Sequence, residues 1–207
     1  KLVKSSITNK LQNVKMGEMM YRFNASESIP MKYYKELSSL RNLVEKVGSL
    51  KVIKTSMRPG RPKNLMVNKE RTGVYFYKNV KTCIFKKENG IISPKLVIEY
   101  SNISCVFNGT PKLILAHKMY GHSYFDKKGE YGISNRDNYV IVDYSEKELE
   151  ILNQFLNLPC IIKLFDATRY RMRYLERYIF DFIPNITSLP DFPKTITEYS
   201  VKKYLKI

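Results

Sequence analysis

The sequence predicts an α+β protein with an N-terminal helix, a mostly antiparallel β-rich middle that forms a sheet or an open barrel, and a helical C-terminal part. Three observations predict this class. Apolar residues recur at helical spacing before residue 48, short β-branched and aromatic runs fill residues 50–142, and helical spacing returns from residue 145. We therefore divide the 207 residues into an N-terminal helical segment (1–48), a β-rich domain with a helical end (49–187), and a connector with a C-terminal helix (188–207).

The first helix is expected over 30–47. Pro30 suits a first helical turn and Gly48 suits the residue after the last turn. One apolar face is built from residues three or four positions apart: Met31, Tyr34, Leu37, Leu40, Leu43, Val44 and Val47. The polar residues 1–28 look irregular, with a short helix expected around 15–23.

The β-rich middle consists of short runs separated by Gly, Pro, Asn and Asp. Hairpin turns are expected at "KENG" (87–90) and "DKKG" (126–129), because each offers a glycine where φ can be positive. Strands are expected near 50–55, 73–77, 81–86, 95–99, 103–107, 112–117, 123–125 and 138–142.

The helical end opens with a capping box, in which Ser145 is the N-cap and Glu148 reaches back to it. Pro159 separates this helix from a second short one. Residues 184–193 hold three prolines and are read as a connector. Thr195 and Glu198 form a second capping box before a C-terminal helix. The apolar face of the first of these helices comprises Leu149, Leu152, Phe155 and Leu156.

The charge balance points to an anionic partner. Lys and Arg number 36 against 19 Asp and Glu, which gives a formal net charge of +17. A folded surface of this charge attracts polyanions, nucleic acid first among them. An AT-rich genome would also enrich Lys, but it would not favour Arg, so the Arg clusters carry more information than the Lys count.

Several chemistries find no support in the sequence. Cys83, Cys105 and Cys160 are widely spaced and suggest no zinc site, and they fit a reducing intracellular compartment such as the cytoplasm, the nucleoid or a viral factory. We expect no metal, no catalytic residue and no nucleotide-binding glycine loop. His117 and His122 are expected to be ordinary surface histidines. Since no apolar run is long enough to span a membrane, no membrane association is expected.

The first candidate binding motif is "TSMRPGRPKN", residues 55–64. Arg58 and Arg61 flank Pro-Gly, and Lys63 follows. The "GRPK" portion is shared with the AT-hook, whose flat backbone lets Arg reach the floor of the minor groove. A stiff basic turn between two strands is the alternative.

The second motif is the polar loop "ISNRDNY", residues 133–139. Asn135, Arg136 and Asn138 are of the types that pair with adenine and guanine edges, so they are the base-reading candidates. A plain turn, with Asn135 or Asp137 bonded to the backbone, explains the same residues.

The third motif is "TRYRMRYLERYIFDFIPN", residues 168–185. We expect a helix from 171 to Pro184, with Met172, Leu175, Ile179 and Phe182 as its buried stripe. The exposed candidates for phosphate contact are Arg169, Arg171 and Arg173.

Residues 110–187 contain a β-strand "PKLILAHK", an aromatic hairpin, an amphipathic helix and the Arg/Tyr-rich stretch, in that order. In order and character this region resembles the target-recognition domain of DNA adenine-N6 methyltransferases of the TaqI/Eco57I type, found in restriction–modification systems. The "[DN]PP[YF]" catalytic motif and the S-adenosylmethionine-binding region of that family are missing here. The resemblance therefore implies a recognition part without its enzyme, which needs S-adenosylmethionine only if a catalytic domain lies elsewhere. The start at Lys1 fits a fragment or a processed product.

Three hypotheses follow. The first is a DNA-recognition module, whose partners are duplex DNA and a separate catalytic domain. The second is a basic structural or packaging protein of a viral particle or another large assembly, with acidic neighbours and a virion as its setting. The third is an RNA-binding module that stacks Tyr rings on unpaired bases.

Overall fold

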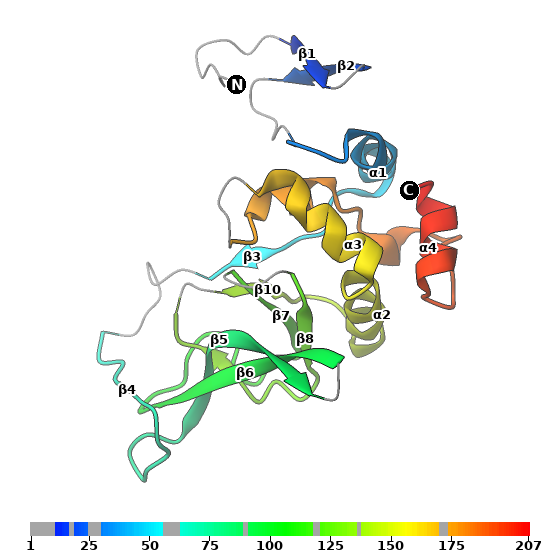
Figure 1. The fold of residues 1–207 in the computed structure, drawn as a ribbon. Helices are drawn as coiled ribbons and strands as arrows, with labels where there is room; N and C mark the ends of the chain where they lie inside the picture. The colour runs from blue at the N-terminus through cyan, green and yellow to red at the C-terminus, as the bar shows by residue number, and fades with distance from the viewer. Residues whose placement is uncertain are drawn as a thin grey trace.

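The computed structural model describes residues 11–16, 19–24, 30–55, 63–88, 91–117, 121–135, 138–169 and 174–207, and it confirms the α+β class. The N-terminal helix and the C-terminal helices cover one side of the described β-structure, which consists mainly of two four-stranded sheets (Figure 1). Within these ranges both sheets have free edges, so they form open sheets rather than a closed barrel.

The first sheet has an entirely antiparallel order of β3 (Ile53–Lys54), β10 (Asn138–Ile141), β7 (Lys112–Ala116) and β8 (Ser123–Asp126). Every residue of β10 is buried. Because successive side chains of a strand point to opposite faces, Tyr139 and Ile141 join the helical core while Val140 packs toward the second sheet. β10 is therefore the strand around which the two layers meet.

The second sheet has the order β4 (Val67–Asn68), β6 (Ile91–Ser101), β5 (Tyr77–Glu88) and β9 (Gly132–Ile133). β5 and β6 pair as one long antiparallel hairpin up to Glu88 and Ile91, and residues 89–90 of the turn expected at 87–90 lie outside the described residues. The hairpin is interrupted by a bulge at Lys81, since Val80 and Thr82 pair with consecutive residues of β6. β9 pairs with β5 in parallel.

Four expectations about the β-structure are wrong. Residues 73–76 form a loop, and in residues 103–107 only Val106 makes an isolated bridge; Phe107 has φ 63°, which no strand accommodates. The turn at 126–129 contains Gly129 at positive φ but does not close a hairpin, because β8 pairs with β7 and β9 with the other sheet. The fourth is the helix expected around 15–23, where β1 (Leu11–Met16) and β2 (Met19–Asn24) form an antiparallel hairpin whose register pairs β-favouring residues such as Val14 and Tyr21.

The α-helices are α1 (Tyr34–Val47), α2 (Glu146–Leu156), α3 (Pro159–Leu164) and α4 (Glu198–Leu205). The capping box of Ser145 and Glu148 is confirmed. α1 begins four residues later than expected, because Tyr33 has a left-handed backbone that the helix cannot include. The cap of α4 is also shifted: Thr197 and Ser200 form the box, not Thr195 and Glu198.

The Arg/Tyr-rich stretch is not an α-helix where it is described. Residues 174–176 are irregular, and short 3₁₀ turns follow at η2 (Arg177–Phe182) and η3 (Ile186–Ser188), after an earlier one at η1 (Phe165–Thr168). The cause is tertiary: the Leu175 N–H donates to His117 O (2.8 Å), and the Tyr139 hydroxyl donates to Leu175 O (2.9 Å). A backbone whose amide and carbonyl are both bonded to strands cannot make helical bonds there.

A buried ion pair at the start of β7 holds the neighbouring loops in place. The Lys112 ammonium lies 2.6 Å from Asp126 Oδ2 and donates to the carbonyls of Phe107 and Thr110. Asp126 also accepts the N–H groups of Glu130 and Tyr131. Lys112 is fully buried, and this burial lowers its pKa even though the neighbouring carboxylate favours its charge. The pair satisfies the polar groups of two loops that would otherwise be buried without partners.

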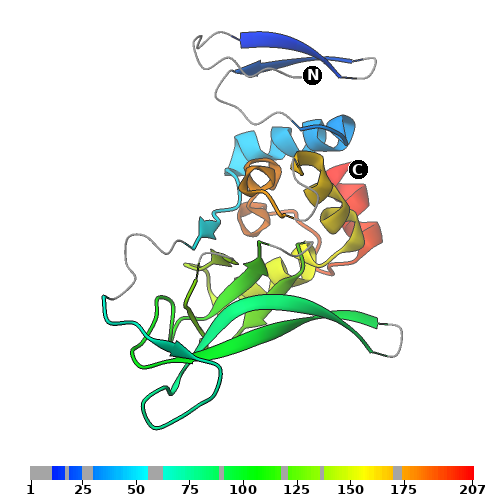
Figure 2. The same cartoon turned by 60° about the vertical axis from the view of Figure 1, so that its left-hand side comes forward.

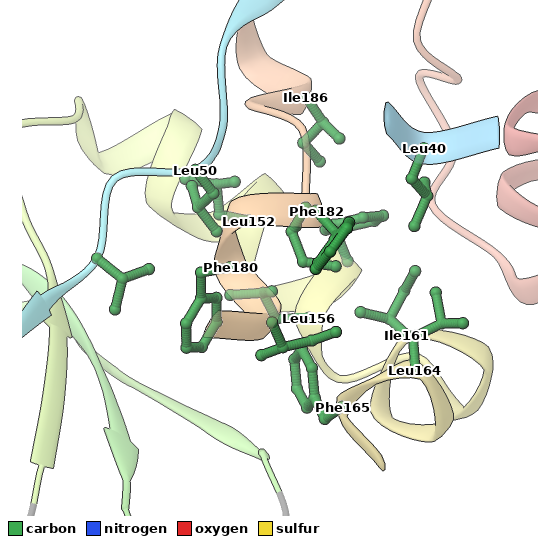
Figure 3. Packing of buried hydrophobic residues seen from close by; sticks show 14 of the residues in the cluster. Leu40, Leu50, Leu152, Leu156, Ile161, Leu164, Phe165, Phe180, Phe182 and Ile186 are labelled. Atoms are coloured by element: carbon green, nitrogen blue, oxygen red, sulfur yellow. The ribbon is translucent and has the colours of Figure 1, made fainter. Parts of the chain in front are cut away.

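The main hydrophobic core lies between the first sheet and the helices (Figures 2 and 3). It draws on all three sequence segments defined above. Leu37 and Leu40 come from 1–48, and the other buried members come from the middle except for three from 188–207: Leu189, Val201 and Leu205. A smaller cluster, centred on Val80, Ile114 and Val140, joins the two sheets. The described β-layer is thereby held as a rigid base for the loops at its ends.

Candidate nucleic-acid interface

One end of the first sheet gathers segments that are far apart in the chain. The register places Asn138, the first residue of β10, beside Ala116 at the end of β7, and Tyr139 beside Lys54 at the end of β3. The next residue, Thr55, donates its N–H to Asn138 O (3.0 Å). Because these strands alternate in direction, the end of β3, the start of β10 and the end of β7 coincide. We call this group of residues the sheet end: Thr55, Ala116, His117, Asn135 and Asn138.

Thr55 is the residue that ties the first two motifs together. Its hydroxyl lies 2.8 Å from the carbonyl oxygens of both Asn135 and Asn138, which are about 80 positions away in the chain. Thr55 is buried, so these contacts are shielded from water. The start of motif 55–64 is therefore fixed against the loop of motif 133–139.

The third motif arrives at the same place from the helical side. The ring of Tyr174 stacks on that of His117, with 4.9 Å between centroids and 28° between planes. Tyr139 packs edge-on against His117 at 5.6 Å, and burial raises the pKa of its phenol, which favours the protonated donor that binds Leu175 O. The chain that follows Arg173 is thereby attached to the sheet end.

Of the candidate contact residues, five lie outside the described residues: Arg58, Arg61, Arg136, Arg171 and Arg173. Their described neighbours in the chain are nevertheless informative. Thr55 stands three positions before Arg58, Asn135 directly precedes Arg136, and Tyr174 directly follows Arg173. The structure thus brings together the attachment points of all three basic segments.

Asn138 has a structural environment. It is fully buried, and its Nδ2 donates to Asn135 Oδ1 (3.1 Å) and contacts the carbonyl of Lys81 (3.5 Å). Asn135 donates to the same carbonyl and is partly exposed. Both side-chain amides thus contact the carbonyl oxygen of Lys81. Lys81 is the bulge residue, which the ladder of β5 and β6 skips. This geometry favours the turn interpretation for Asn138 and leaves Asn135 partly accessible.

Arg169 and Lys63 differ in their surroundings. Arg169 Nη2 lies 2.7 Å from Asp166 Oδ1, and only 19% of its side chain is exposed. Lys32 contacts the other oxygen of Asp166 at 3.4 Å. The carboxylate therefore offsets part of the charge of Arg169, whereas Lys63 is exposed in a turn before β4. Lys63 is the more accessible cation of the two.

Sequence reasoning missed a buried carboxylate next to the loop. Glu99 is 7% exposed; its Oε1 accepts the hydroxyl of Ser134 (2.5 Å), and its Oε2 lies 3.6 Å from Lys81 Nζ. Lys54 Nζ lies 6.0 Å from the centre of the Tyr139 ring. No local pattern marks these residues, because each acquires its role from a strand that is distant in sequence.

The described part of the chain contains no cluster of three or more His, Cys, Asp or Glu residues that could hold a metal ion. None of its helices is both long and apolar enough to cross a membrane. The cysteine thiols are buried and unoxidised, and burial raises the pKa of Cys83 to about 11. No protein-family model, curated protein or solved structure matches this chain.

Proposed function

We propose that this chain is a nucleic-acid-binding module that grips duplex DNA with the sheet end and the basic segments attached to it. The observation that carries the proposal is the pair of Thr55 hydrogen bonds to Asn135 and Asn138, which joins two Arg-containing motifs. A formal charge of +17 supplies the attraction to a polyanion. The resemblance to target-recognition domains favours DNA over other polyanions.

Chain geometry supports a shared contact surface. Three residues of extended chain span at most about 11 Å, and Arg58 is three positions from Thr55 in the chain. Arg136 and Arg173 are each one position from a residue attached to the sheet end. Their guanidinium groups suit backbone phosphates, to which they can bond through two N–H groups at once.

The roles of the candidates differ. We assign phosphate or groove contact to Arg58, Arg61, Lys63, Arg171 and Arg173, and base contact to Arg136 and Asn135. Asn138 has a structural role in the loop 133–139, since its side chain is buried. Arg169 is a weaker candidate than its neighbours because Asp166 offsets its charge.

The finer proposal is a target-recognition module of an adenine-N6 methyltransferase or another restriction–modification protein. In that setting a separate catalytic domain would bind S-adenosylmethionine and carry out methyl transfer. This chain would dock on the duplex and present its loops to the base edges.

The test is the salt dependence of duplex binding, measured by fluorescence anisotropy for wild type and for charge variants. Each lost phosphate contact reduces the slope of log affinity against log salt by about 0.9. We expect Arg58→Ala with Arg61→Ala, and separately Arg171→Ala with Arg173→Ala, to reduce the slope by about 2. The matched control is Lys147→Ala with Lys203→Ala, which removes the same charge from exposed positions of α2 and α4.

Equal slopes for the sheet-end and control variants would contradict the proposed interface. A wild-type slope near zero would contradict nucleic-acid binding altogether. Preference for single-stranded RNA in competition would favour the RNA-binding hypothesis. Stable association with a large assembly, without a preference among DNA sequences, would favour the packaging hypothesis.

A further inference from the structure

The loop at the outer end of the second sheet combines exposed apolar and basic side chains. We call residues 63–76 the outer loop; it includes β4 and leads into β5. Figures 1 and 2 show it beyond the sheet, far from the helices. Leu65 is buried, but four other apolar side chains of the loop are exposed. The exposed fractions are 53% for Met66, 40% for Val67, 59% for Val74 and 44% for Phe76.

The outer loop is a built structure that holds these side chains outward. Thr72 closes its tip, because its hydroxyl accepts the N–H of Tyr75 (3.1 Å) and its own N–H donates to Tyr75 O (2.9 Å). Asn102 braces its base by accepting the Met66 N–H (2.8 Å) and donating to Asn64 O (3.0 Å). The side chain at the tip is Val74, the most exposed of the four apolar ones.

The register places two of the apolar residues on one face. Val67 and Tyr77 both pair with Ser101, the last residue of β6, so Met66 and Phe76 flank Asn102, the residue after the strand, and project to the same side. The Phe76 ring lies 4.3 Å from the Tyr77 ring, which supports it from one side. The sheet face that is buried near Val80 thus continues outward into an exposed apolar edge.

The positive charge of the outer loop favours an anionic ligand. Lys63, Lys69 and Arg71 are all exposed, and Glu70 is the one acidic residue in the range. Apolar side chains set among cations are the composition of wedges that proteins insert between base steps while Lys and Arg hold the flanking phosphates. Lys63 is also the last basic residue of motif 55–64, which begins at the sheet end, so the two surfaces are continuous in the chain.

We infer that the outer loop is a second DNA contact, in which Val74 and Phe76 enter a groove and open a base step while Lys69 and Arg71 bind the adjacent phosphates. This inference rests on the proposed function. The wedge distorts DNA at a place separate from base reading, so it contributes through the deformability of the site.

Permanganate oxidation of thymines in a thymine-rich duplex measures the opening, because stacked thymines react slowly. With saturating wild-type protein we expect enhanced oxidation. Val74→Ala with Phe76→Ala should abolish the enhancement and weaken affinity about 10-fold, the scale of one lost stacking contact, with an unchanged salt slope. Lys69→Ala with Arg71→Ala should reduce the slope by about 2. Val106→Ala, which removes another exposed apolar side chain, is the matched control.

The failures of the two proposals are distinguishable. If wild type binds the duplex but oxidation stays at the level of free DNA, or persists in the Val74/Phe76 variant, the wedge is refuted and DNA binding stands. If wild type binds no duplex, both are refuted. Phe76-dependent binding to anionic lipid vesicles, without DNA binding, would assign the outer loop to a membrane surface instead.

Discussion

The buried pair of Lys112 and Asp126 should dominate the stability of the β-layer, and Asp126→Asn tests this. The substitution keeps the shape of the side chain but removes the counter-charge, 2.6 Å away, of an ammonium that is fully buried. Removing one partner of a buried ion pair costs about 3–5 kcal/mol. One of the two backbone N–H groups that Asp126 accepts also meets an amide N–H₂ in place of oxygen, which adds about 1 kcal/mol.

We expect Asp126→Asn to lower the free energy of unfolding by about 4–6 kcal/mol, a large share of the 5–15 kcal/mol typical of a domain. Urea unfolding followed by circular dichroism measures it. The control is Glu146→Gln, because Glu146 lies at the same 2.6 Å from Lys127 but both side chains are more than half exposed. Exposed pairs contribute little, so the control should unfold close to wild type.

The pH dependence of this variant has a defined sign. Burial lowers the pKa of Lys112 in the folded state from its ordinary value of 10.5, so the unfolded chain binds more protons in that range. The variant lacks the carboxylate that opposes this shift. Its stability should therefore rise with pH, more steeply than that of wild type, until pH 10.5. If Asp126→Asn costs no more than the exposed control, the reasoning from burial is refuted.

Three further predictions concern positions away from the interface. Gly121→Ala should cost about 2–4 kcal/mol in urea unfolding, because φ is +89° and a Cβ would lie 1.9 Å from the Phe165 ring; an unchanged midpoint would refute the close approach. Asn157→Ala should cost about 2–3 kcal/mol and speed hydrogen exchange at Ser123, since the Asn157 amide pairs with both the N–H and the carbonyl of that residue at 3.0 Å; an unchanged exchange rate would refute this bracing. Burial raises the pKa of Tyr124 from 10.0 to about 12, so its contribution to stability is complete below pH 10 and is lost as pH rises through 12; Tyr124→Phe should flatten this alkaline loss, and an identical pH profile would contradict it.

The features that sequence predicted best are those with local causes. The capping box needs only Ser145 and Glu148, three positions apart, and both its bonds form. The apolar face of α2 follows from 3.6-residue spacing, and all four residues expected there are buried. The antiparallel pairing of β5 with β6 follows from Asn-Gly between two β-prone runs.

The features that could not be predicted from the sequence depend on contacts with residues far along the chain. The expected helix in the Arg/Tyr stretch fails at Leu175 because His117 and Tyr139 take its backbone groups. Three residues of its expected buried stripe are nevertheless buried, Leu175 in the irregular segment and Ile179 and Phe182 in η2, while Met172 lies outside the described residues. Apolar spacing near three or four residues reports burial more surely than it reports helix type.

The candidate site likewise combines features that the sequence predicts with features that depend on distant contacts. Composition alone pointed to the basic motifs, but the contact that unites the first two of them is made by Thr55, a residue without any distinguishing local pattern. The structural environment of Asn138 likewise depends on the Lys81 bulge, 57 positions away. Residue type suggested which side chains could bind nucleic acid, and tertiary contacts decided which of the described candidates are accessible.

Hydrogen–deuterium exchange with and without duplex DNA tests the location of the interface most directly. If the sheet end binds DNA, exchange should slow in peptides that cover 55–63, 134–139 and 170–175, and should not change in those that cover α2 and α4. Protection confined to the helical side, or none at any of the three segments despite saturated binding, would contradict the claim that the sheet end binds DNA.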